Sequence, residues 1–336
     1  ILQNGIQQIA RMPVNEENPL LLVSIYAQTK NTEWMTDPTG QTVPKGVPAQ
    51  GNLTVTGVWD MIPDDLKPHT AIQLHGDDFV GHGCGGNGDH DALWAWYGYF
   101  VDQAEEYNRN EPDTSKHINL YLTLMTGGTP ISVLNRTVPD DELTQFIAEH
   151  DCIKGVVLSE NHNNSDTVAV AEVSAKYLKM MAQQGCYLVL TDIDRPGANM
   201  MEKWFNDTDT LYNAAKKYHQ YLIINSKSTT SSGFNTVRSF ALGAWLGGLA
   251  DNWGALTDAW TWYETGYHRI FSGINKVTYE DVRRVYTFPE TLFAMNMLQC
   301  YANGAVVFNA EHPFYCTGVN DKASWALKAV SYTHLT

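Results

Sequence analysis

The sequence contains few charged residues, and basic residues are the scarcer sign. Lys and Arg number 22 among 336 residues, against 37 Asp and Glu, and the four types together make up 18% of the chain. The formal net charge of −15 repels phosphate backbones and argues against general nucleic-acid binding. Hydrophobic residues reach 43%, which favours a packed globule over a disordered chain.

Long apolar runs are also missing. No segment approaches the ~18 consecutive apolar residues that a membrane-spanning helix needs, so no membrane partner is expected. The chain begins with Ile1, with no start methionine or signal peptide before it, which indicates a trimmed chain. Residues 331–336 belong to no periodic element and are expected to be a non-native or disordered tail.

Cysteine is sparse and irregular. The five positions are Cys84, Cys152, Cys186, Cys300 and Cys316. Their odd number and wide spacing match neither a disulfide framework nor a zinc pattern, so buried free thiols are expected.

Several catalytic motifs are absent. The glycine-rich stretch from Gly76 to His90 lacks the Lys–Ser/Thr of a P-loop and does not form a dinucleotide fingerprint. Its acids and histidines match no zinc or calcium pattern, so no metal and no cofactor are predicted. No nucleophilic serine motif is found.

Aromatic residues, in contrast, are abundant. The 10 Trp, 17 Tyr and 11 Phe often stand beside Asp, Asn and Gly. Rings next to hydrogen-bonding side chains suit a sugar, whose C–H faces stack on them. A large aromatic core is the alternative explanation.

Short apolar runs alternate with amphipathic helical stretches. The expected strands are Leu20–Ala27, Thr70–His75, Ile118–Met125, Ile153–Glu160, Tyr187–Asp192, Tyr221–Asn225 and Ala305–Glu311, with Ala244–Trp253 as a weak eighth. The main expected helices are Asp91–Tyr107, Asp140–His150, Asp166–Gln184, Asp207–Gln220 and Thr291–Ala302. Eight such units predict an α/β fold, a single (β/α)8 TIM-type barrel over residues 1–330, with a doubly wound sheet as the alternative.

Polar residues end most of the predicted strands. In a parallel barrel the carboxyl ends of the strands surround one mouth, so His75, Glu160, Asp192, Asn225 and Glu311 would converge there. Two carboxyl groups at one mouth suggest glycosidic bond cleavage, one as acid and the other as base. Helix capping or ion pairing is the structural alternative for each of them.

A third acidic region, LADNWGALTDAWTWYE, is rich in tryptophan. It places Asp251 and Asp258 among Trp253, Trp260 and Trp262. Acids interleaved with indoles fit a sugar subsite, although an ordinary loop that enters a capped helix would give the same pattern.

Extended segments resemble glycoside hydrolase family 98. The resemblance is carried by TGVWDMIPDDLKPHTAIQLH, GVVLSEN, LGAWLGGLADNWGALTDAWTWYETGY and FPETLFAMNMLQCYANGAVVFNAEHPFY, and it covers about Val23 to Tyr315. It implies a secreted or cell-surface bacterial (β/α)8 enzyme that cleaves internal β-1,4 linkages with inversion. The implied substrates are blood-group-type galactosyl glycans or, alternatively, decorated xylan.

The same resemblance implies roles for individual residues. Glu160 corresponds to the general acid, and Glu311 with Asp258 to a general-base pair, with Asp251 in reserve for the aspartate. The expected substrate-binding residues are His75, Asn225, Trp253, Trp260, His162, His312 and Tyr315. A β-sandwich and carbohydrate-binding module that commonly accompany the barrel are missing from this sequence.

Two other functional classes stay open at this point. A sugar-binding barrel without activity would need only the aromatic groove. A metal-dependent hydrolase could use His75, His162, Asp192 and His312. The sequence does not predict an oligomeric state.

Overall fold

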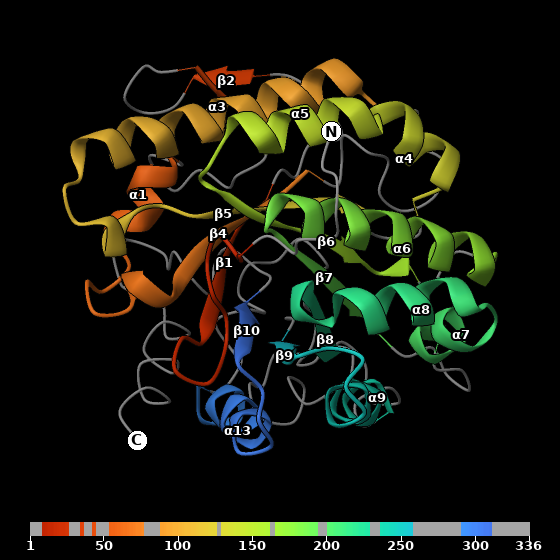
Figure 1. Ribbon diagram of the computed structural model, residues 1–336. Helices are drawn as coiled ribbons and strands as arrows, with labels where there is room; N and C mark the ends of the chain where they lie inside the picture. The colour runs from red at the N-terminus through yellow and green to blue at the C-terminus, as the bar shows by residue number, and fades with distance from the viewer. Residues whose placement is uncertain are drawn as a thin grey trace, which may run out of the picture.

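The protein is a closed barrel of eight parallel strands surrounded by helices (Figure 1). The computed structural model describes residues 9–26, 34–36, 42–44, 54–76, 88–125, 129–161, 165–193, 200–228, 236–257 and 290–310. In order around the barrel the strands are β1 (Leu20–Tyr26), β10 (Val307–Ala310), β9 (Asn252–Thr257), β8 (Leu222–Ser228), β7 (Tyr187–Asp192), β6 (Ile153–Ser159), β5 (Leu120–Met125) and β4 (Thr70–His75). The predicted (β/α)8 fold is confirmed.

The helices lie in the connections between strands, as parallel pairing requires. They are α1 (Val55–Asp60), α3 (His90–Asn110), α4 (Ile131–Thr137), α5 (Asp140–Glu149), α6 (Thr167–Gln184), α7 (Met200–Asn206), α8 (Asp209–Tyr218), α9 (Thr236–Leu246) and α13 (Glu290–Tyr301). Short 3-10 turns are η1 (Lys67–His69), η2 (Thr114–Lys116) and η4 (His219–Tyr221). The connection after β1 holds a small antiparallel pair, β2 (Trp34–Thr36) and β3 (Thr42–Pro44).

Helix α6 shows how closely local sequence sets an element's ends. The Asp166 side chain accepts a hydrogen bond from the backbone N–H of Ala169 at 2.9 Å, which caps the first turn. Gly185 ends the helix in the left-handed region at φ 69°, where a side chain would be strained. A Cβ there would also lie 2.6 Å from the carbonyl oxygen of Ile9. Both ends of this helix are therefore readable from the sequence.

The eighth strand differs from its prediction. Most of the expected segment Ala244–Trp253 belongs to the end of α9 and the turn after it, and β9 begins only at Asn252. Gly248 stands in that turn with φ 71°, so the glycines that weakened the strand prediction terminate a helix. The strand itself follows in NWGALT.

Two apolar clusters occupy alternate residues of the strands. The larger cluster joins strand residues such as Leu21, Leu188 and Ile224 to the surrounding helices. The smaller cluster contains the alternate strand residues and the N-terminal segment, with no helical residue among its described members. Because successive side chains on a strand point to opposite faces, the smaller cluster fills the barrel interior.

Three cysteines are described, and all are buried free thiols, as predicted for them. Burial raises the pKa of Cys152 to about 12 and that of Cys186 to about 11, and it also raises the pKa of Cys300. Cys84 and Cys316 lie outside the described residues. These thiols act as apolar core groups rather than as nucleophiles.

None of the helices in the described part of the chain is long and apolar enough to cross a membrane.

Candidate active site

The barrel interior changes character along its axis. Toward the amino ends of the strands the inward residues are apolar: Leu20, Leu22, Ala71, Tyr121, Val157, Tyr187, Val189, Ile223 and Val307. Toward the carboxyl ends they are buried and polar: Ser24, Gln73, His75, Thr123, Ser159, Thr191, Asn225, Lys227 and Asn309. Buried polar side chains cost free energy unless they hydrogen-bond, so their concentration at one end marks a site.

Part of this polar layer is tied together by hydrogen bonds across strands. Gln73 on β4 donates to Thr123 Oγ1 on β5 at 2.9 Å, and Asn309 on β10 donates to Gln73 Oε1. His75 Nε2 lies 3.1 Å from Ser24 Oγ on β1. These contacts hold the carboxyl ends of β10, β1, β4 and β5 in register.

Other groups in the layer have no protein partner in the described part of the chain. The buried atoms without a hydrogen-bond partner there include both side-chain amide atoms of Asn225, the hydroxyl of Thr191 and the Oδ1 atom of Asn309. The absence of a side chain at Gly254 leaves space for the Asn225 amide, since a Cβ at position 254 would lie 2.8 Å from Asn225 Oδ1. Buried donors and acceptors of this kind are suited to bind water or a polar ligand.

Glu160 lies at this polar end, directly after β6. Its backbone N–H donates to the carbonyl oxygen of Thr191 at 3.0 Å, and its φ of 53° is in the left-handed region that non-glycine residues rarely adopt. Backbone strain of this kind is typical of functional positions. Its side chain is 18% exposed, so the carboxylate reaches solvent at the barrel mouth.

The carboxylate of Glu160 forms an ion pair with the ammonium of Lys227 on β8. The Lys227 side chain is fully buried. Its position two residues after Asn225 places it on the inward face of β8. A neighbouring ammonium stabilises the ionised form of the carboxyl group.

Lys227 was missed by sequence reasoning. The predicted strand stopped at Asn225, but β8 continues to Ser228 and carries the lysine inside the barrel. The one available signal was the alternation of Ile223, Asn225 and Lys227, which share a face only if the strand runs on.

The turn after Glu160 is held by Asp192 at the end of β7. Its Oδ2 atom accepts from the backbone N–H of Asn161 at 2.6 Å, and its Oδ1 atom accepts from the N–H of Ile193 at 2.7 Å. These charge-assisted hydrogen bonds keep the backbone after β6 against β7 and so help to position Glu160.

Asp251 is not at the mouth, which corrects its reserve role as a base. It precedes β9, so it lies at the amino end of the barrel, opposite the polar layer. Its Oδ1 atom is 2.5 Å from His219 Nδ1, on the turn that precedes β8.

Trp253 is likewise wrong as a stacking residue. Its side chain is fully buried in the cluster between the barrel and the helices, together with Ile224 and Phe308. No sugar can reach a ring packed on that side of the sheet.

Of the remaining predicted site residues, two are described by the structure and six are not. His75 and Asn225 are in the polar layer. Outside the described residues lie Glu311, Asp258, Trp260, His162, His312 and Tyr315. Among the residues that the structure does describe, no three His, Cys, Asp or Glu side chains gather as metal ligands would.

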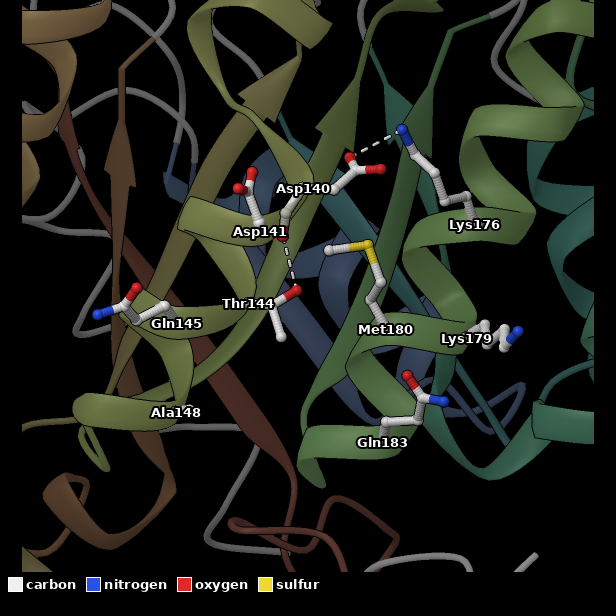
Figure 2. Close-up of a pocket in the computed structure, with 9 residues that line it drawn as sticks. All are labelled: Asp140, Asp141, Thr144, Gln145, Ala148, Lys176, Lys179, Met180 and Gln183. Carbon is white, nitrogen blue, oxygen red and sulfur yellow. Dashed lines mark hydrogen bonds and ion pairs between the residues drawn. The ribbon is translucent and has the colours of Figure 1, made fainter. Parts of the chain in front are cut away.

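A groove of about 610 Å³ lies elsewhere, on the outside of the barrel between α5 and α6 (Figure 2). It is lined by Asp140, Asp141, Thr144, Gln145, Ala148, Lys176, Lys179, Met180 and Gln183. Asp140 and Lys176 pair across it at 2.8 Å. Its walls are two surface helices, so it lies apart from the polar layer inside the barrel.

Comparison with known proteins places the chain in a family. The model of glycosyl hydrolase family 98 matches residues 8–335. The chain belongs to glycosyl hydrolase family 98. It is 30% identical over 321 residues to a blood-group-substance endo-1,4-beta-galactosidase of Clostridium perfringens, an alignment that covers 94% of this chain and 37% of the relative.

Solved family 98 structures agree with this assignment. The catalytic module of a family 98 glycoside hydrolase from Streptococcus pneumoniae superimposes with a TM-score of 0.76 at 27% identity, over 98% of this chain and 54% of that one. The same module in complex with the H-disaccharide blood group antigen gives 0.74 at 26% identity, over 98% and 54% of the two chains. Its complex with the LewisY pentasaccharide gives 0.74 at 26%, over 97% and 53%. The present chain thus spans between about a third and a half of the length of these relatives.

Proposed function

We propose that this protein is an inverting endo-β-1,4-galactosidase that hydrolyses internal linkages in branched, blood-group-type glycans. The observation that carries the proposal is the order of strands in the barrel. Glu160 follows β6, and β10, which immediately precedes Glu311 in the sequence, lies four strands away on the opposite wall. An acid and a base presented from opposite walls leave room for a water molecule between the base and the anomeric carbon.

The strand order also favours Asp258 as the aspartate of the base pair. Asp258 directly follows β9, which is hydrogen-bonded to β10. In the sequence, each of the two expected base residues therefore follows one of two neighbouring strands. Glu160 would protonate the leaving oxygen while Glu311, assisted by Asp258, would remove a proton from the attacking water.

The substrate class is supported by the relatives. One is a blood-group-substance endo-1,4-beta-galactosidase, and another binds the H-disaccharide and the LewisY pentasaccharide. The buried polar groups beneath the mouth suit a ligand rich in hydroxyls. Glycans of this class are extracellular, so we also propose that the protein acts outside the cell.

A product assay tests the substrate directly. The protein is incubated with blood-group-type oligosaccharides and, in parallel, with arabinoxylan, and products are identified by mass spectrometry. Release of a blood-group oligosaccharide is expected, with the α-anomer appearing first by NMR because a β linkage is inverted. Cleavage of arabinoxylan alone would assign a xylanase, and retention without cleavage would assign a sugar-binding barrel.

The role of Glu160 is tested by Glu160→Gln. This variant keeps the shape of the side chain but cannot donate the proton, so kcat should fall by ~10³-fold or more. Glu142→Gln is the matched control, since Glu142 lies on α5 and contacts His90 at 2.6 Å. Turnover of Glu160→Gln at the rate of that control would refute the assignment.

A further inference from the structure

We infer that Lys227 is a positioning residue for the general acid: its buried ammonium holds the Glu160 carboxylate at the mouth and stabilises the charge that forms there on proton transfer. The inference rests on the proposed role of Glu160. It is carried by the geometry of the pair, in which a fully buried lysine from β8 contacts a partly exposed glutamate that follows β6.

Burial of Lys227 is itself a reason to assign it a function. Removing an ammonium from water is energetically unfavourable, and replacing a buried ion pair by apolar side chains is often neutral or stabilising. The barrel interior already has an apolar layer, so folding alone gives no need for a charge near its open end. A lysine retained there is better explained by what it does to its partner.

The backbone around Glu160 is arranged to make this contact. Its left-handed φ of 53°, its N–H bond to Thr191 and the anchoring of Asn161 by Asp192 together fix the direction in which the side chain leaves β6. β7 lies between β6 and β8, so the ion pair spans one intervening strand. Strain that is maintained by several contacts is characteristic of preorganised sites.

The energetic consequence follows the direction of proton transfer. Before the reaction Glu160 must hold a proton, and afterwards it is a carboxylate. The ammonium interacts more strongly with the carboxylate, so its contribution grows toward the transition state and lowers the barrier.

Other described charged groups on the elements packed around the pair have hydrogen-bond partners of their own. The described ones on the elements packed around it are Asp192 on β7, which binds the backbone of Asn161 and Ile193; His75 on β4, against Ser24; Asp166, which caps α6; and Arg238 on α9, which donates to Asn296 and Gln299. Lys227 is the cation that forms an ion pair with Glu160, so its removal should move the titration of that carboxyl.

The test compares Lys227→Met with Lys227→Arg, Glu160→Gln and wild type, after unfolding curves have established that each is folded. Activity is measured against pH on the natural oligosaccharide and on aryl glycosides with leaving groups of increasing acidity. Lys227→Met should lower kcat about 10- to 100-fold on the natural substrate, with a small change in KM, because a positioned acid is lost.

Two readouts separate this role from mere structural support. The basic limb of the pH profile should move to higher pH in Lys227→Met, because the carboxyl has lost an opposite charge. The loss of rate should shrink as the leaving group becomes more acidic, since such groups need no proton, and Lys227→Arg should restore much of the activity.

Lys176→Met is the matched control, since Lys176 pairs with Asp140 on the outside of the barrel. It should leave every kinetic parameter unchanged. If Glu160→Gln loses activity but Lys227→Met keeps the wild-type pH profile and leaving-group dependence, the inference is overturned while the proposed function stands. If Glu160→Gln is fully active, the proposed function itself fails. If Lys227→Met does not fold, Lys227→Gln replaces it in the test. A wild-type pH profile and leaving-group dependence in Lys227→Gln would also overturn the inference.

Discussion

The two ends of the barrel interior differ in the polarity of the side chains that fill them. The amino end is packed with aliphatic and aromatic side chains and is covered by the N-terminal segment, in which Val14 is buried and its N–H bonds to Tyr187 Oη at 3.1 Å. The carboxyl end holds amides, hydroxyls and an ion pair, several of them without protein partners in the described chain. The difference indicates that one end stabilises the fold and the other is reserved for chemistry.

The covering of the amino end involves more than apolar contact. Arg11 donates to the carbonyl oxygens of Gln184 at 2.9 Å and Ile147 at 3.0 Å, near the ends of α6 and α5. A cation at two helix C-termini satisfies unpaired carbonyls and complements the helix dipoles. The N-terminal segment thus ties helices and barrel together on the side away from Glu160.

Of the substitutions that test the difference between the two ends, Gly155→Val on β6 is expected to have the largest effect. A Cβ at this position would lie 2.4 Å from the Tyr121 ring and 2.7 Å from the carbonyl oxygen of Tyr187, in the apolar interior. Overpacking should lower the free energy of unfolding by about 3 kcal/mol or prevent folding. Chemical denaturation measures this.

Gly98→Ala provides the control for that experiment. Gly98 is within α3, and a Cβ there would meet nothing within 4 Å, so the variant should be slightly more stable than wild type. A Gly155→Val protein as stable as Gly98→Ala would show that the amino end is not tightly packed.

An intermediate effect is expected from Gln73→Leu, in the polar layer. The substitution removes the group that donates to Thr123 and accepts from Asn309, and leaves both of them buried without that partner. The free energy of unfolding should fall by about 1–3 kcal/mol. Turnover should also fall, about tenfold, because β10 is less firmly placed. Stability and kcat measured together check this, and loss of stability with unchanged turnover would contradict a functional role for the layer.

The smallest effect is expected from Asp251→Asn, at the opposite end. The pair with His219 is largely exposed, with side chains 46% and 34% accessible, and pairs of this kind contribute up to about 1 kcal/mol. Turnover should be that of wild type, since the residue is remote from the mouth. A loss of kcat comparable with that of Glu160→Gln would return Asp251 to the catalytic candidates.

Particular elements show how far sequence reasoning reached. β4 and β7 begin and end where their apolar runs predict, and α6 ends at Gln184 as predicted, because these signals are local. The position of β9 was predicted wrongly because its sequence, NWGALT, is short and the glycine-containing turn before it is as apolar as the strand. Trp253 was predicted to stack on a sugar because acids and other tryptophans are close to it in sequence. The register of β9 instead directs its side chain toward the helices.

The chain by itself determined the barrel, the strand on which Glu160 stands and the nature of the three described cysteines. All of these follow from periodicity, caps and apolar runs within a few residues of one another. Only the tertiary structure decided that Lys227 reaches Glu160, that Asp251 lies at the closed end and that Trp253 faces the helices. These outcomes depend on where strands stop and which face each residue occupies, and a shift of one residue along a strand reverses that face.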